Sequence, residues 1–204
     1  CYLCLNISDL YLMSLDMYEI LEIPDSSERG LQDLFHEKGW GDGLPMIAPT
    51  RERVEEMLSA SQDLDPDEVI ASLPPRNGVA TRRIIAVNAV MAGCRPEHFP
   101  VLVSAIRALS APEVNLRGVN ATTHCVAPLL IVHGKAARDG NYNSGLGAFG
   151  PGNLANAATG RAVRLTLLHV AGATPGVGDA STQGSPAKYS YCVAENLDSS
   201  PWGG

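Results

Sequence analysis

Two neighbouring side chains, His124 and Cys125, are the residues of this chain best suited to proton transfer or nucleophilic attack. They follow a polar run that begins at Asn120 and precede an apolar run, so we expect them where a loop enters a strand. A cysteine beside a histidine can be activated as a thiolate, although neighbours in sequence often point apart. A small buried cysteine and a hydrogen-bonded histidine fit the same pattern. We expect His124 to move a proton, Cys125 to be the second catalytic candidate, and Asn120 and Thr123 to bind a ligand.

A glycine-rich loop and the helix start that follows it form the second candidate region, from Asn141 to Arg164. Four glycines fall within eight residues, a density that indicates close backbone approach or positive φ angles. Helix N-termini preceded by such polar loops often hold anions. The expected ligand-binding residues here are Asn143, Ser144, Gly150, Gly152, Asn153, Asn156, Arg161 and Arg164.

The helix part of this region has a polar side. Asn153 and Asn156 are three residues apart, and Arg164 is close to them in helical angle. An exposed face with a packing contact at Gly160 explains the pattern as well as a functional face does. The two arginines favour function, because a guanidinium binds carboxylate or phosphate with two hydrogen bonds.

The glycines at 145, 147 and 150 also match the dinucleotide-binding pattern G-x-G-x-x-G. That fingerprint directly follows a strand and has an acidic residue about 20 positions later. Here the expected strand ends ten residues before the first glycine, and no carboxylate lies near Val170. The match therefore does not indicate a Rossmann site, and the sequence names no cofactor.

Composition and charge exclude several classes of protein. At 204 residues with 45% hydrophobic and 18% charged residues, the chain suits one folded domain. Residues 1–70 carry 16 acidic and 4 basic side chains, whereas residues 71–204 carry 6 acidic and 11 basic ones. The basic excess in the second part favours a small anionic or amide-like ligand there, but it is too sparse for nucleic acid. No apolar run reaches the roughly 18 residues of a membrane span.

The five cysteines are an odd and widely spaced set. This argues against a disulfide framework and for a reducing compartment, so we expect a cytoplasmic protein. Ligand types for zinc are present, but no paired metal-ligand spacing occurs, and we expect no metal site.

The elements that position these candidates follow from capping residues and periodicity. Helices are expected at 28–38, 51–60, 82–92, 96–110 and 153–170, and strands at 69–73, 114–119, 129–132 and 188–194. Long helices and short strands predict an α/β or α+β fold, with a small mixed sheet packed against several helices. Residues 1–25 are expected to form a peripheral arm, and residues 26–204 a single domain.

Several segments resemble a bacterial and metagenomic family that occurs linked to, or fused with, proteins of the UGSC-type selenoprotein group. The segments are GWGDGLPMIAPT, PPRNGVAT, AVNAVMAGCRPEHFPV, NLRGVNATTH, NYNSGLGAFGPG, KYSYCVAEN and SPW, and they span residues 36–202. The resemblance implies a partner protein with a cysteine or selenocysteine redox centre. This chain has no UGSC or CGSC motif itself, so we expect such a centre to be supplied in trans or by a missing region. The family supplies no reaction to transfer.

Three hypotheses of function remain open. The first is an enzyme domain or subunit that binds a small polar or anionic molecule, and it predicts a concave polar pocket where His124 and Arg164 converge. The second is a non-catalytic subunit whose glycine-rich surface docks a redox protein, and it predicts an exposed apolar patch. The third is a metal-binding protein, which predicts histidine and cysteine atoms at coordination distance.

Overall fold

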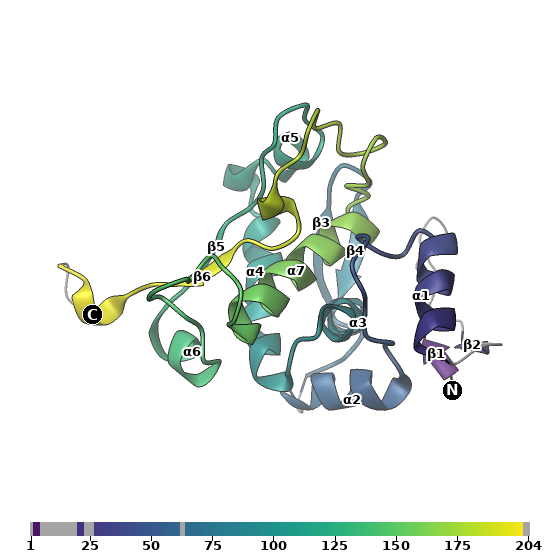
Figure 1. Ribbon diagram of the computed structural model, residues 1–204, viewed down its shortest axis with the longest axis horizontal. Helices are drawn as coiled ribbons and strands as arrows, with labels where there is room; N and C mark the ends of the chain where they lie inside the picture. The colour runs from purple at the N-terminus through teal and green to yellow at the C-terminus, as the bar shows by residue number, and fades with distance from the viewer. Residues whose placement is uncertain (1, 5–19, 23–26, 62–63, 202–204) are drawn as a thin grey trace.

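The computed structural model describes residues 2–4, 20–22, 27–61 and 64–201 (Figure 1). The α-helices are α1 (Glu28–Glu37), α2 (Arg51–Ser59), α3 (Arg82–Ala92), α4 (Phe99–Leu109), α5 (Leu116–Asn120), α6 (Gly134–Asp139) and α7 (Leu154–His169). The strands are β1 (Tyr2–Cys4), β2 (Ile20–Glu22), β3 (Val69–Leu73), β4 (Gly78–Thr81), β5 (Leu130–Val132) and β6 (Cys192–Ala194). Short 3₁₀ turns occur at Pro96–His98, Pro112–Val114, Pro186–Lys188 and Leu197–Ser199.

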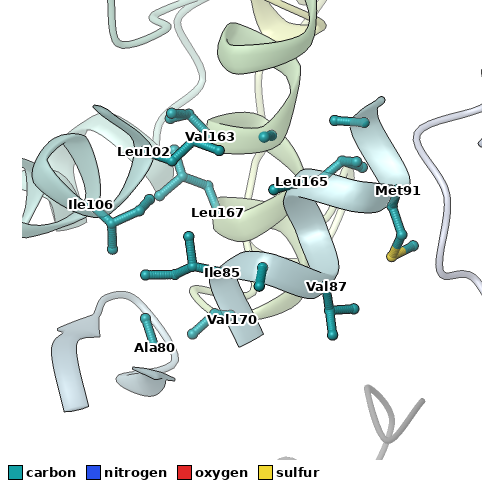
Figure 2. Close-up of a cluster of buried hydrophobic side chains, with 14 of the residues drawn as sticks. Ala80, Ile85, Val87, Met91, Leu102, Ile106, Val163, Leu165, Leu167 and Val170 are labelled. Carbon is teal, nitrogen blue, oxygen red and sulfur yellow. The ribbon is translucent and has the colours of Figure 1, made fainter. Parts of the chain in front are cut away.

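Helices α3, α4 and α7 form the centre of the main core. Figure 2 shows Ile85 of α3, Leu102 of α4 and Leu167 of α7 pointing toward one another, and all three side chains are fully buried. Helix α3 is apolar nearly all round, as its sequence predicts, because α7, α4 and α2 all pack against it. The glycine-rich region is therefore attached to the most buried part of the molecule through α7.

The strands form separate pairs rather than one sheet. β3 and β4 are antiparallel, with Leu73 opposite Gly78, whereas β5 and β6 are parallel, with Leu130 opposite Cys192. β6 packs on α7, which lies between the two pairs (Figure 1). The chain is a mixed α/β single domain, which confirms the expected fold class.

Local capping signals place most helix starts correctly. Ser27, Thr50, Thr81 and Asn153 each accept a hydrogen bond from the backbone N–H three residues later, as N-cap residues do. Gly93 ends α3 in the left-handed conformation, with φ of 87°.

The strand expected at 114–119 is wrong. This segment enters helix α5 instead, because Asn115 adopts a φ of 48° and its side chain caps the Gly118 N–H. Asn tolerates this left-handed conformation, and its short amide side chain satisfies a free donor of the helix start. The late strand is also shorter than expected, since only Cys192–Ala194 pairs.

The expected arm at residues 1–25 lies mostly outside the described residues. Within it, β1 and β2 pair antiparallel. Among the residues that the structure describes, no helix has the length and apolar character of a membrane span.

Gly160 marks the closest approach between α7 and the segment that contains β6. A Cβ atom at this position would lie 2.7 Å from the Tyr191 backbone nitrogen and 3.2 Å from the Cys192 Cβ. Only glycine lets the two backbones come this close. The packing contact at Gly160, one of the two explanations of the helix pattern, is therefore present.

Candidate functional site

The side chain of Asn156 organises the glycine-rich loop. Its Oδ1 accepts from the Asn143 N–H at 2.9 Å, and its Nδ2 donates to the carbonyls of Asn143 at 2.9 Å and Ala148 at 3.0 Å. The residue is buried. The amide predicted to bind a ligand is thus used to hold the loop over the first turn of α7.

Asn143 and Asn153 have similar roles. Asn143 Oδ1 accepts from the Gly145 N–H at 2.9 Å, and its Nδ2 donates to the Leu146 carbonyl at 3.1 Å. Asn153 caps α7 through the Asn156 N–H and donates to the Asn141 carbonyl. Of the remaining loop candidates, Ser144 is half-buried, and Gly150 and Gly152 are exposed.

Arg161 points away from this loop and holds a distant turn. It binds Asp42 with two hydrogen bonds of 2.8 and 2.9 Å, and it donates to the carbonyls of Leu44 and Pro45. Burial opposes ionisation of Asp42, but the hydrogen bonds from Arg161 and from the Leu44 N–H outweigh it and lower the pKa of the carboxyl. This ion pair uses the guanidinium that the sequence suggested for a ligand.

Arg164 lies further along α7 and meets the C-terminal segment. Its Nε donates to the Lys188 carbonyl at 3.0 Å, and its Nη2 lies 3.7 Å from Asp179 Oδ2. Lys188 Nζ donates to the same carboxylate oxygen at 2.6 Å. Arg164 therefore belongs to a second cluster, separate from Asn143, Asn153 and Asn156.

The remaining candidates precede β5 in the chain, with Asn120 at the end of α5 and Thr123, His124 and Cys125 in the segment that follows it. The Thr123 carbonyl accepts from the Thr182 N–H at 3.1 Å, and Asn120 is buried with its Nδ2 donating to the Pro74 carbonyl. His124 and Cys125 are exposed.

The two candidate regions adjoin opposite ends of the β5–β6 pair. Asn143 joins Ala194, at the carboxyl end of β6, whereas the His124 segment leads into the amino end of β5. His124 is nearer to the Arg164 cluster, because Thr182 and Asp179 belong to one short segment. The structure thus brings the loop asparagines together and sets His124 apart from them.

A pocket of about 280 Å³ opens beside the glycine-rich loop. We call it the loop pocket, and its lining residues are Ala148, Phe149, Gly150, Asn156, Ala157, Pro186, Ala187, Ser190, Tyr191 and Cys192. Among the described residues, no charged side chain lines it. The rings of Phe149 and Tyr191 lie 5.5 Å apart at a tilt of 49°. Its surface suits an uncharged, apolar or aromatic group.

The glycine-rich loop also presents apolar side chains to solvent. Leu146 is fully exposed, and Phe149 is 65% exposed. Leu154, in the first turn of α7, is 45% exposed. The docking hypothesis predicts an exposed apolar surface, and these three exposed side chains lie on the glycine-rich loop or in the helical turn that follows it.

A larger hollow, of about 480 Å³, lies between α1 and residues 39–46. None of the candidate residues lines it.

The structure describes the side chains of three of the five cysteines. Cys94, Cys125 and Cys192 are free thiols, and the side chains of Cys1 and Cys4 lie outside the described residues. Burial raises the pKa of the Cys192 thiol to about 12, so the thiol in the loop pocket is neutral. Among the described residues, no three histidine, cysteine or acidic side chains gather as metal ligands do.

His169, the last residue of α7, is a buried titratable group. Its ring nitrogens lie 2.7 Å from Asn88 Oδ1 and 2.7 Å from the Trp40 carbonyl. Burial lowers the pKa of His169 to about 4, and the Trp40 hydrogen bond and the Asp42 charge offset this only in part. Both partners of the ring nitrogens are acceptor oxygens, because Asn88 Nδ2 donates to the Ile84 carbonyl, so a neutral imidazole donates to only one of them at a time. With its pKa lowered to about 4, the imidazole is neutral at pH 7, and it lies between α7, α3 and Trp40.

Stability is expected to fall as pH decreases from about 6.5 to about 4. In this pH range His169 is protonated in the unfolded chain but neutral in the folded protein. The free energy of unfolding therefore falls by up to about 3 kcal/mol. Burial also lowers the pKa of His98, which adds to the effect in the same direction. Urea unfolding at pH 7, 6, 5 and 4.5 measures the slope. His169→Gln should flatten it, and a wild-type stability that is constant over this range would contradict the assignment.

Four residues described above were not among the site residues predicted from the sequence, namely Leu146, Phe149, Asp179 and Lys188. Leu146 and Phe149 could have been found from the sequence, because they are large apolar residues inside an otherwise polar, glycine-rich loop. Asp179 and Lys188 had no comparable signal, because their partner Arg164 lies on a different element.

Comparison with protein-family models, with curated proteins and with solved structures finds no match to this chain.

Proposed function

We propose that the chain is a non-catalytic subunit that docks a partner protein through its glycine-rich loop. The observation that carries the proposal is the exposure of Leu146 and Phe149 on a loop whose asparagine side chains are used internally. Exposed large apolar groups on an ordered loop are typical of binding surfaces.

Hydrogen bonds from asparagine side chains order the glycine-rich loop before any partner binds. Asn143 bonds to the Leu146 carbonyl and Asn156 bonds to the Ala148 carbonyl, so the backbone on both sides of Gly147 is fixed. A surface ordered before it meets its partner loses less conformational entropy on association. This rigidity favours a docking role over that of a flexible linker.

The loop pocket is suited to receive an apolar side chain of the partner. Its volume of about 280 Å³ lies just below the range of about 300 to 1,000 Å³ that holds drug-sized ligands. Aromatic rings beside such a pocket commonly anchor an interface. The neutral Cys192 thiol does not favour nucleophilic catalysis there.

The resemblance to the family linked with UGSC-type proteins supports the partner's class. We therefore propose that the partner carries a cysteine or selenocysteine redox centre, and that this chain positions it without supplying a catalytic group.

The test is titration calorimetry of the purified chain against a purified UGSC-type protein in its cysteine form. The double variant Leu146→Ser/Phe149→Ser should weaken binding by about 30-fold, the loss of a hot spot of about 2 kcal/mol. Val177→Ser is the matched control, because Val177 is an 83% exposed apolar side chain on a turn outside the loop. It should leave the affinity unchanged.

Two results would overturn the proposal. One is that the wild-type chain does not bind this partner. The other is that the double variant binds it as tightly as the wild type. Sedimentation of the chain alone adds a further check, because self-association that the double variant abolishes would make the loop a homodimer interface instead.

A further inference from the structure

Arg164, Asp179 and Lys188 form a nearly buried cluster with an unbalanced charge. The side chains are 9%, 5% and 12% exposed, respectively. Both cations face the same carboxylate oxygen, Asp179 Oδ2, at 3.7 and 2.6 Å. Two positive charges thus share one negative charge at a site largely removed from water.

An excess charge of this kind is costly unless something compensates it. Burial lowers the pKa of Arg164, and Asp179 offsets this only in part. Burial opposes ionisation of Asp179, but hydrogen bonds from Lys188 and Ser181 lower the pKa of its carboxyl, so it is already ionised and has no further charge to give.

The guanidinium end of Arg164 retains hydrogen-bonding capacity. Its Nε is engaged by the Lys188 carbonyl, but neither Nη nitrogen makes a hydrogen bond to the part of the chain that the structure describes. The Nη nitrogens are not among the fully buried unsatisfied atoms, so they keep contact with solvent. Lys188 Nζ uses one of its three donors on Asp179.

We propose that this cluster binds a small carboxylate, held by the Nη groups of Arg164 and by Lys188 Nζ. A planar guanidinium donates two parallel hydrogen bonds to a carboxylate. One negative charge neutralises the cluster, whereas a phosphate dianion would reverse its sign. The site is independent of the docking surface proposed above, since no residue of the cluster lines the loop pocket.

The loop that carries His124 borders this site. Thr182, three residues after Asp179, donates its N–H to the Thr123 carbonyl at 3.1 Å. The rest of a molecule whose carboxylate is bound at Arg164 would extend from the cluster toward solvent.

The test is an NMR titration of the full chain with sodium acetate at constant ionic strength, with the Arg164 Nε–H resonance as the readout. The expected result is a saturable shift with a dissociation constant in the millimolar range. Lys188→Met should weaken binding at least tenfold. Lys135→Met is the matched control, since Lys135 is an exposed lysine of α6 outside the cluster, and it should leave binding unchanged.

Asp179→Asn is expected to change acetate affinity in the direction opposite to Lys188→Met, and it leaves both cations of the cluster in place. Removal of the competing carboxylate should tighten acetate binding. A non-saturable titration, an equal loss in Lys135→Met and Lys188→Met, or weaker binding in Asp179→Asn would overturn the site. Tighter binding of inorganic phosphate than of acetate would overturn its assignment to carboxylates.

Discussion

Replacing Gly160 with alanine is expected to destabilise the fold by about 3 kcal/mol. The new Cβ would lie 2.7 Å from the Tyr191 backbone nitrogen, so β6 must shift away from α7. That shift also disturbs the pairing of β5 with β6, because Leu130 N–H bonds to the Tyr191 carbonyl. Urea unfolding at pH 7 measures the loss.

Gly145→Ala is the control for this substitution. Its Cβ would meet Asn143 Oδ1 at 3.5 Å, an ordinary contact, and its φ is not positive. The expected change is within about 0.5 kcal/mol. If Gly160→Ala were equally mild, the close packing of α7 against β6 would not limit stability.

Replacing Arg161 with methionine is expected to cost about 3 to 5 kcal/mol. The substitution leaves the Asp42 carboxylate, which is only 10% exposed, without its counter-charge. It also removes the donors to the Leu44 and Pro45 carbonyls. Denaturant unfolding at pH 7 should show the loss as a lower midpoint with an unchanged slope.

Arg107→Met is the matched control, because its 58% exposed side chain faces Glu68 at 3.6 Å. Exposed pairs of this kind contribute at most about 1 kcal/mol. The double variant Asp42→Asn/Arg161→Met should recover part of the loss, since no buried charge then remains. A cost below about 1 kcal/mol for Arg161→Met alone would contradict the argument.

Features set by neighbouring residues could be predicted from the sequence. Thr81 and Gly93 bound α3 correctly, because a cap depends on hydrogen bonds within one helical turn. The segment after Pro112 could not be assigned by the same means, since its apolar residues fit a strand until Asn115 adopts its left-handed conformation.

The candidate site could be predicted only in part. The polar side of α7 was visible in the sequence, but the partners of its side chains were not. Arg161 binds Asp42, which lies 119 residues earlier, and no local pattern announces such a pairing. Asn156 looked available for a ligand for a related reason, because the carbonyls it binds become close only when the glycine-rich loop folds back.

The position of α7 in the chain has a consequence for synthesis on the ribosome. The apolar surface of α3 and the Asp42 turn both emerge well before α7, and both need it for burial or charge pairing. We therefore expect nascent chains to expose the apolar surface of α3 until residue 169 has left the exit tunnel. Chaperones that bind apolar segments are expected to bind these nascent chains during that interval. Folding is thus largely completed after most of the chain has been translated, and truncated products that stop before α7 should be cleared rather than accumulate as folded fragments.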